Sequence, residues 1–256
     1  MGSQIVYYVD AIAKMDKIFR YLEDNDSIEF MSIVNDLGIS KSSAHRLVSF
    51  LVELGYLEKE ENNRIRLGIR LFKLGYKMGE SISLNKVARP HLEKLSKETG
   101  FVVHLCMTNQ DGEGIFLDRI DSRAYTFTDT AIGGKVAFHC SAAGKCLAAW
   151  AEPEHYHRIV SSLDFKAYTK NTITNIQDFN LEMEKIRRVG YSTDLSEREN
   201  FIKAIGMPIF DWSGKLVGAI SLGAFNSEFD AMDFNHMLSC VQTAVNEIEK
   251  GIGIQK

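Results

Sequence analysis

Hydrophobic residues recur at helical spacing through the first part of the chain and divide it into three predicted helices. The apolar positions of the first helix are Val9, Ile12, Met15, Ile18, Phe19 and Leu22, and those of the third are Ala44, Leu47, Val48, Leu51 and Leu54. Ser27 is the predicted N-cap of the second helix and Gly38 its end; Ser40 is the predicted N-cap of the third, which ends at Gly55. Because only residues 38–40 separate the second helix from the third, the two must cross, as in a helix-turn-helix.

The pattern changes from helical spacing to alternation after Gly55. A turn is predicted at residues 61–63, and the strand that follows it alternates arginines with Ile65 and Leu67. One face of this strand is expected to pack on the helices while the other carries guanidinium groups. Residues 1–68 are therefore predicted to form a winged helix-turn-helix domain.

Residues 69–100 predict a helical linker, in which Pro90 should begin a helical turn or bend the segment. Beyond the linker, "FVVHLCM" and "IFLDRI" flank the turn "NQDGEG", and "KAIGMPIF" and "KLVGAISLGA" flank residues 211–214, so two hairpins are expected. Helices are predicted for "SAAGKCLAAW", for a segment that ends at Gly190 and for the segment after Phe234. Hairpins with helices between them predict an α+β domain over residues 101–256.

Composition places the chain among ordinary globular proteins. Its 256 residues, 45% hydrophobic and 25% charged, are enough for two modest domains. No apolar run approaches the roughly 20 residues that cross a bilayer, and no secretory signal is visible, so no membrane partner and a cytoplasmic location are expected. The cysteines form no CxxC pair and are expected to be reduced thiols; they are Cys106, Cys140, Cys146 and Cys240.

Charge is unevenly distributed along the first 77 residues. Residues 38–77 hold eight Lys and Arg against four Glu, a net +4, whereas residues 1–37 hold three cations against seven acids, a net −4. The overall charge of −4 gives no indication of nucleic acid. The local excess places positive charge on the third helix, the wing and the linker, the surfaces that would meet DNA.

The start of the third predicted helix carries short side chains and hydrogen-bond donors. A helix that enters the major groove needs such groups at its N-terminal end, and its dipole favours phosphate there. We therefore predict double-stranded DNA as a partner. The predicted contacts are Ser40, Lys41, Ser42, Ser43, His45 and Arg46 on the helix, and Asn62, Asn63 and Arg64 on the wing. The alternative is that this face is solvated, or that the winged domain binds a protein instead of an operator.

Several motifs occur in an order that resembles one known family. They are "GISKSSAHRLVSFLVELGYLEKEENNRIRLGIRLFKLG", "GGKVAFHCSAAGKCLAAW", "TITNIQDFNLEMEKIRRVGYSTDLSERE" and "IGMPIFDWSGKLVGAISLG". Together they resemble the IclR family of bacterial transcriptional regulators over nearly the whole chain. The resemblance implies a winged helix-turn-helix, a linker helix that mediates dimerisation, and a C-terminal GAF-like domain that binds a small metabolite. The expected partners are a palindromic DNA operator, a small anionic metabolite and a second copy of the chain, as a homodimer or a dimer of dimers.

The resemblance also implies an effector pocket. From the residues alone, the small side chains of "GGKVAFHCSAAGK" allow backbone N–H groups to approach a ligand, and Ser141 can cap the next helix. In IclR-type domains, the positions matching Ala142 and Ala143 donate backbone hydrogen bonds to a ligand oxygen. The remaining implied pocket residues are Asp194, Ala204, Ser221 and Gly223, with Tyr125, Thr128 and Val136 on the apolar side.

Two of these positions depart from the members that bind two- and three-carbon oxoacids. Those members usually have Cys where Ala204 stands and Ser where Gly223 stands. The space left here is larger, which favours a bulkier carboxylate or a sugar acid. The alternative for Asp194 is an acid on the surface beside a helix.

No residue pattern indicates catalysis, a metal or a cofactor. His139 and Cys140 are neighbours in sequence and would not face each other on a helix, and no acid is placed to orient them. His155 and His157 lack a third ligand at a recognisable spacing, and His104 is expected in the core or the pocket. The sequence thus predicts a ligand-responsive transcriptional regulator and not an enzyme; the alternative is a metabolite-sensing protein-interaction module without operator binding.

Overall fold

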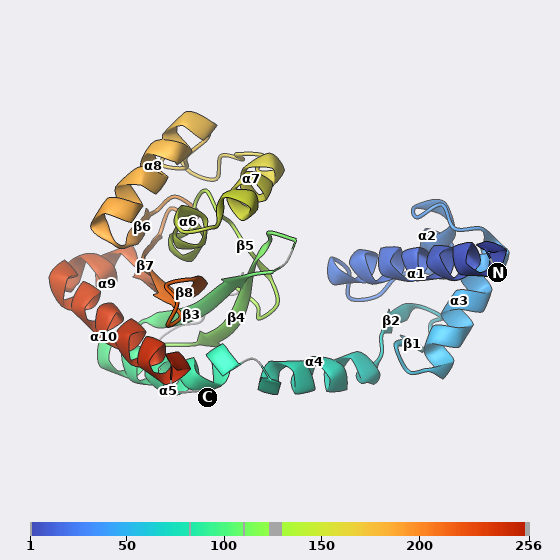
Figure 1. The fold of residues 1–256 in the computed structure, drawn as a ribbon. Helices are drawn as coiled ribbons and strands as arrows, with labels where there is room; N and C mark the ends of the chain where they lie inside the picture. The colour runs from blue at the N-terminus through green and yellow to red at the C-terminus, as the bar shows by residue number, and fades with distance from the viewer. Residues whose placement is uncertain (1, 82, 110, 123–129, 254–256) are drawn as a thin grey trace. The chain divides into compact units, whose positions relative to one another are not determined.

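The computed structural model describes residues 2–81, 83–109, 111–122 and 130–253, and the chain divides into two compact units, Met1–Ser81 and Ile82–Lys256. The division falls inside the segment that was predicted as the linker. Figure 1 shows the helices and strands of each unit.

The first unit is a winged helix-turn-helix, as predicted. Its elements are α1 (Gly2–Glu23), α2 (Phe30–Asn35), α3 (Lys41–Glu53), β1 (Leu57–Lys59), β2 (Ile65–Leu67) and α4 (Ile69–Ser81). β1 and β2 pair antiparallel and form the wing. One apolar cluster holds the three helices and the wing together because each contributes at least one buried side chain; examples are Ile18, Ile33, Val48 and Ile65.

The ends of the short helices follow the sequence in part. Gly38 and Gly55 follow α2 and α3 with φ of 65° and 76°, a backbone conformation that suits glycine. The prediction for Ser27 was wrong, because α2 begins at Phe30 with Glu29 as its N-cap. Ser27 Oγ instead accepts a hydrogen bond from Arg64 Nε of the wing at 2.8 Å. Ser40 is the N-cap residue of α3, but its side chain makes no capping hydrogen bond.

The second unit is an α+β domain built on one antiparallel sheet in the order β5-β4-β3-β8-β7-β6. The strands are β3 (Val102–Thr108), β4 (Gly114–Ile120), β5 (Lys135–Val136), β6 (Ser192–Leu195), β7 (Ile202–Phe210) and β8 (Leu216–Phe225). The helices are α5 (Ser83–Thr99), α6 (Ala142–Ala149), α7 (Pro153–Ser162), α8 (Ile176–Val189), α9 (Asn226–Ala231) and α10 (Phe234–Gly253). Both predicted hairpins, β3–β4 and β7–β8, are confirmed, and Pro90 lies inside α5.

Helices cover both faces of this sheet. α5 and α10 lie side by side on one face, and α6 lies on the other with α7 and α8 outside it (Figure 1). The strands alternate accordingly. On β8, Ile220 and Leu222 belong to the core beneath α5 and α10, whereas Ala219 belongs to the core beneath α6. The sheet thus separates two apolar cores.

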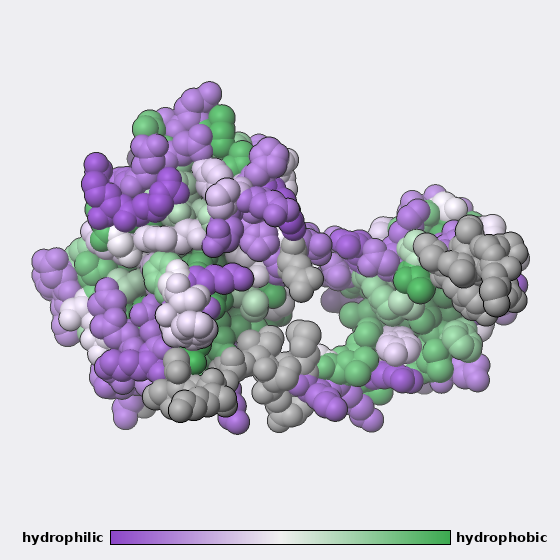
Figure 2. Space-filling model, viewed as in Figure 1, coloured by the Kyte–Doolittle hydropathy of each residue, from purple (hydrophilic) through white to green (hydrophobic). Residues whose placement is uncertain are grey.

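The visible surface is mainly polar, with smaller apolar areas on both units (Figure 2). Apolar side chains are exposed on α4, where Ile69 is 58% exposed and Leu74 is 51% exposed. Trp212, in the turn between β7 and β8, is 83% exposed. Within the described ranges, no helix is both long enough and apolar enough to cross a membrane.

Candidate functional site

A cavity of about 280 Å³ lies in the second unit, beside the N-terminus of α6. The structure brings six of the predicted ligand-binding residues together around it: Ala142, Ala143, Asp194, Ala204, Ser221 and Gly223. Val136 is buried in the apolar cluster beneath α6 and is not among the lining residues. Tyr125 and Thr128 fall outside the described residues.

The N-terminus of α6 offers backbone donors at the cavity. Ser141 is its N-cap, as predicted, and Ser141 Oγ accepts a hydrogen bond from Gly144 N at 3.1 Å. Lys145 N donates to Ser141 O at 2.9 Å. The N–H groups of Ala142 and Ala143, in the first turn, have no acceptor within the helix. Together with the helix dipole, these two groups suit a carboxylate or another anionic oxygen.

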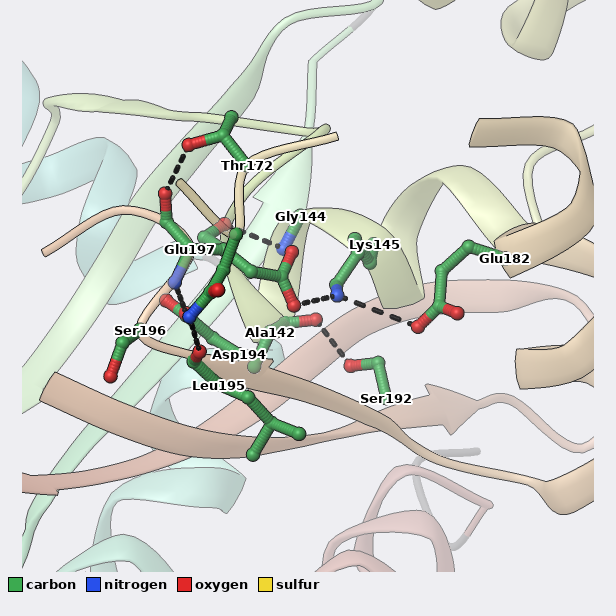
Figure 3. A network of polar contacts seen from close by, with 12 residues as sticks. Ala142, Gly144, Lys145, Thr172, Glu182, Ser192, Asp194, Leu195, Ser196 and Glu197 are labelled. Atoms are coloured by element: carbon green, nitrogen blue, oxygen red, sulfur yellow. Dashed lines mark hydrogen bonds and ion pairs between the residues drawn. The ribbon is translucent and has the colours of Figure 1, made fainter. Parts of the chain in front are cut away.

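Two glycines and a serine bring this helix end close to the sheet. A Cβ at Gly144 would lie 2.2 Å from Ala137 O, and a Cβ at Gly206 on β7 would lie 2.6 Å from Ala142 O. Neither position has room for a larger residue unless the backbone shifts. Ser192 Oγ of β6 donates to Ala142 O at 2.6 Å (Figure 3). The position of the two free donors is therefore fixed by contacts with β6 and β7.

Asp194 is a buried acid on β6, only 4% exposed, and it faces the cavity. It lies opposite Ala204 of β7, another lining residue. Its Oδ1 accepts a hydrogen bond from Glu197 N at 2.7 Å. Burial raises the pKa of Asp194 to about 7, and the nearby charge of Glu197 acts in the same direction. The alternative of a surface acid is therefore wrong.

A buried ion-pair network lies next to Asp194. Lys145 of α6 is 1% exposed, and its Nζ is 2.5 Å from Glu197 Oε1 and 3.5 Å from Glu182 Oε1 (Figure 3). Thr172 Oγ1 donates to Glu197 O at 2.6 Å. Burial raises the pKa of Glu197, and Lys145 opposes this shift. Glu197 Oε2 is buried and has no hydrogen-bond partner among the described residues.

One lining residue agrees with the sequence analysis, which placed His104 in the core or the pocket. His104 lines the cavity and its Nε2 lies 2.9 Å from Thr130 Oγ1; burial lowers the pKa of His104 to about 3, so the ring is neutral at pH 7. His104 also pairs with Ser221 in the sheet. Strand alternation alone could not have shown this neighbour, because the histidine of "FVVHLCM" lies beside the serine of "AISLG" only when β3 pairs with β8.

The walls of the cavity combine aromatic and cationic side chains that the sequence did not single out. Phe116, Phe201 and Phe225 line it, and so do Lys135 and Arg198. The Arg198 guanidinium carbon lies 4.2 Å from the centre of the Tyr168 ring. A cation in the cavity adds to its affinity for an anion.

The predicted DNA-binding residues lie in two places on the first unit. Ser40, Lys41, Ser42, His45 and Arg46 are exposed at the start of α3, and Ser43 is half-buried. Within the described residues, neither Lys41 nor Arg46 takes part in an ion pair. Both cations are therefore available to a phosphate or a base edge.

The wing presents Asn62 and Asn63 at its exposed turn, where Asn63 has a φ of 65°. Arg64 is half-buried and its Nη2 donates to Ser27 O at 2.5 Å, in addition to the Nε contact with Ser27 Oγ. Arg66 Nη2 is 2.9 Å from Glu58 Oε2 on β1. Both wing arginines are thus engaged inside the domain, where Arg64 braces the wing against the segment before α2.

His139 and Cys140, the neighbours considered as a nucleophile and a base, have other surroundings. His139 Nε2 lies 3.0 Å from Lys166 O, and burial raises the pKa of Cys140 to about 12, so the thiol stays protonated at pH 7. No group of three or more His, Cys, Asp or Glu side chains in the described ranges could hold a metal ion.

Comparisons with protein families agree with this architecture. The helix-turn-helix domain of the IclR type matches residues 11–61, and the C-terminal domain of bacterial IclR transcriptional regulators matches residues 77–250. The HTH-type transcriptional regulator KdgR of Dickeya chrysanthemi is 26% identical over 96% of this chain and 80% of its own. XynR of Escherichia coli is 25% identical over 90% of this chain and 92% of its own.

Solved structures share the fold. The crystal structure of the Thermotoga maritima IclR has a TM-score of 0.72 and 25% identity, and it covers 97% of this chain and 99% of its own. An IclR homolog from Microbacterium hydrocarbonoxydans, complexed with 4-hydroxybenzoate, has a TM-score of 0.81 at 22% identity. It covers 94% of this chain and 98% of its own. With both domain matches and the two-unit fold in agreement, the chain belongs to the IclR family, whose members are DNA-binding transcriptional regulators and not enzymes.

Proposed function

We propose that this regulator binds an inverted-repeat operator as a homodimer or a dimer of dimers and responds to a small organic acid that carries a hydroxyl group. It would act in the cytoplasm, on bacterial DNA. The observation that carries the proposal is the cavity at the N-terminus of α6, which joins two backbone donors that lack an acceptor within the helix to a buried acid.

The chemistry of the cavity indicates how such a ligand would bind. The N–H groups of Ala142 and Ala143 would receive the carboxylate, and Arg198 would add positive charge. Ser221 and an ionised Asp194 would bind a hydroxyl, since an ionised Asp194 repels a bare anion. The phenylalanine walls favour an acid with an apolar body over a sugar acid rich in hydroxyls. The Microbacterium homolog, which has the same fold, is complexed with an acid of this kind.

Thermal unfolding in the presence of organic and sugar acids tests the effector site. A ligand present at about 100 times its Kd should stabilise the folded protein by about 2.7 kcal/mol. Asp194→Ala should weaken the binding of a hydroxy acid by about 1 to 3 kcal/mol, because the ligand hydroxyl loses its partner. A ligand that stabilises the variant and the parent equally would place the effector site elsewhere.

DNA binding is proposed for α3 and the wing turn. Lys41, His45 and Arg46 present donors at the exposed start of α3, and Asn62 and Asn63 present donors at the wing. Arg64 would act by holding the wing in place, given its contacts with Ser27. Binding to random and operator DNA at several salt concentrations tests the assignment, because phosphate contacts release counterions. A winged domain that binds a protein would show no such salt dependence on DNA.

A further inference from the structure

Two buried acids lie together at the cavity: Asp194 lines it and Glu197 lies beside Asp194, and they differ in how their charge is balanced. Glu197 Oε1 lies 2.5 Å from the ammonium of Lys145, whereas within the described residues no ion pair joins Asp194 to a cation. The two acids are adjacent, since the backbone N–H of Glu197 donates to Asp194 Oδ1. Asp194, Glu197 and Lys145 are 4%, 7% and 1% exposed, so water screens little of their interaction.

The charges around Asp194 come from several elements. The titratable and charged groups are Lys145 of α6, Glu182 of α8, Glu197, Arg198 and Glu199 after β6, His104 of β3, Lys135 of β5 and Cys140. At pH 7, His104 and Cys140 are neutral. Lys135 pairs with Glu113 and Lys185 with Glu182, so with these partners included four cations face four carboxylates before Asp194 is counted. Ionisation of Asp194 would therefore add an unbalanced negative charge at a buried position.

Which of the two acids keeps the proton follows from the ion pair. Lys145 stabilises the ionised form of Glu197 directly, and Glu197 in turn repels a charge on Asp194. Lys145 also lowers the pKa of Asp194, but its effect there is smaller than the repulsion from Glu197. The buried Glu197 Oε2, which lacks a donor, adds to the excess of acceptors. We propose that Lys145 and Glu197 are positioning residues that make Asp194 the proton-binding group of the cavity, so that the ligand preference of the site changes with pH.

The two forms of Asp194 suit different ligands. A protonated Asp194 donates its O–H to a carboxylate or oxo oxygen, and the site accepts an anion without a hydroxyl, taking one proton from solvent. An ionised Asp194 accepts a hydrogen bond from a ligand hydroxyl and repels an anion that lacks one. This inference rests on the proposed effector site for its ligand part, whereas its proton-binding part concerns the protein alone.

The first experiment follows the carboxyl group of Asp194 directly and uses no ligand. Carbon NMR of protein labelled at the aspartate carboxyls, assigned with Asp194→Asn, should show Asp194 changing protonation near pH 7. Glu197→Gln should move this midpoint down by about one unit, because the like charge is lost. Glu182→Gln is the matched control: Glu182 contacts the same lysine at 3.5 Å but is not one of the groups that shift the pKa of Asp194, so the midpoint should move less than in Glu197→Gln.

The titration of the wild-type protein is decisive by itself, even if Glu197→Gln does not fold. A titration midpoint of Asp194 near that of an ordinary aspartate would overturn the proposal. Equal shifts in the two glutamine variants would also overturn it, since they would mean that any disturbance of the Lys145 network moves Asp194.

The second experiment uses benzoate and 4-hydroxybenzoate, which differ by one hydroxyl. Calorimetry should show benzoate affinity falling up to about tenfold per pH unit above the Asp194 midpoint, with a smaller fall for 4-hydroxybenzoate. A parallel pH dependence for the two acids would overturn the ligand preference. If neither acid binds, the proposed ligand preference and the proposed effector chemistry are both contradicted. The protonation of Asp194 is tested independently by the NMR titration.

Discussion

Asp194 combines burial with a folded-state pKa far above its ordinary value of 3.8, and this fixes the sign of its effect on stability. Between about pH 4 and 7 the unfolded chain has released this proton and the folded protein still holds it, so folding stability falls as pH rises through this window. The loss is at most about 1.4 kcal/mol per pH unit. Below the window the group has no effect, and above pH 7 the penalty is complete.

Asp194→Asn should therefore become more stable relative to the wild type as pH rises from 4 to 7, and the difference should then level off. Chemical denaturation of both proteins at a series of pH values measures it. The subtraction removes the contribution of the other titrating groups. A difference that does not change with pH would contradict the raised pKa.

At the scale of residues, Lys41 and Arg46 are predicted to contact DNA. Arg46→Ala should weaken operator binding by about 1 to 3 kcal/mol if the guanidinium reads a base. Lys41→Ala should weaken binding to all sequences alike and reduce the salt dependence, as expected for a phosphate contact. Lys215→Ala, an exposed cation in the other unit, provides a control that should change neither quantity. Unchanged DNA affinity in both α3 variants, with helical content intact by circular dichroism, would remove α3 from the interface.

At the scale of elements, the cap of α6 should matter for both stability and ligand binding. Ser141→Ala removes the hydrogen bond to Gly144 N and should lower the free energy of unfolding by about 1 kcal/mol. Asn175→Ala, which removes the matching cap of α8 at Asp178 N, should cost a similar amount. Only Ser141→Ala should also weaken effector binding, because α6, unlike α8, begins at the cavity and supplies backbone donors there. Denaturation and calorimetry on the pair separate the two effects; equal losses of ligand affinity would contradict a specific role for α6.

The elements themselves were predictable because their signals are local. Hydrophobic spacing and turn residues located the main helices, the wing and both hairpins, and Ser141 was correctly identified as a cap, whereas α9, β5 and β6 were not predicted. The resemblance to a family, and not periodicity, brought Ala142, Asp194 and Ser221 together as a site.

What the sequence could not provide were contacts between distant residues. Ser27 was misjudged as a cap because its partner, Arg64, lies 37 residues away. Lys145 and Glu197 are 52 residues apart, and no local pattern distinguishes a buried lysine from the exposed ones. Their pairing depends on how α6 packs against the sheet, and the protonation of Asp194 depends on that pairing.

For the whole molecule, self-association is the central expectation. One winged domain contacts too few base pairs to select a site in a genome, so we expect a two-fold dimer on an inverted repeat. Ile69 and Leu74 leave apolar surface exposed on α4, which suits a contact with a second copy. Footprinting should show two protected half-sites related by a dyad. A single half-site protected by a monomer would contradict the dimer.

Replacing Ile69 and Leu74 by Ser should weaken self-association, as measured by analytical ultracentrifugation, because exposed apolar area would be lost from the contact. Trp212→Ser is the matched control, since Trp212 is exposed in the turn between β7 and β8. If Trp212→Ser weakens self-association and the α4 substitutions do not, the interface lies on the second unit.

The alternation along the central strands has a consequence for how such sensors diverge. On β7 and β8, the cavity residues Ala204, Ser221 and Gly223 are interleaved with Ile205, Ile220 and Leu222, which pack beneath α5 and α10. Successive side chains of a strand point to opposite faces. The residues that line the cavity can therefore change under selection, while packing keeps the residues beneath α5 and α10 constant. A duplicated gene could thus acquire a new chemical signal through a few substitutions on one side of two strands, without rebuilding the scaffold that carries them.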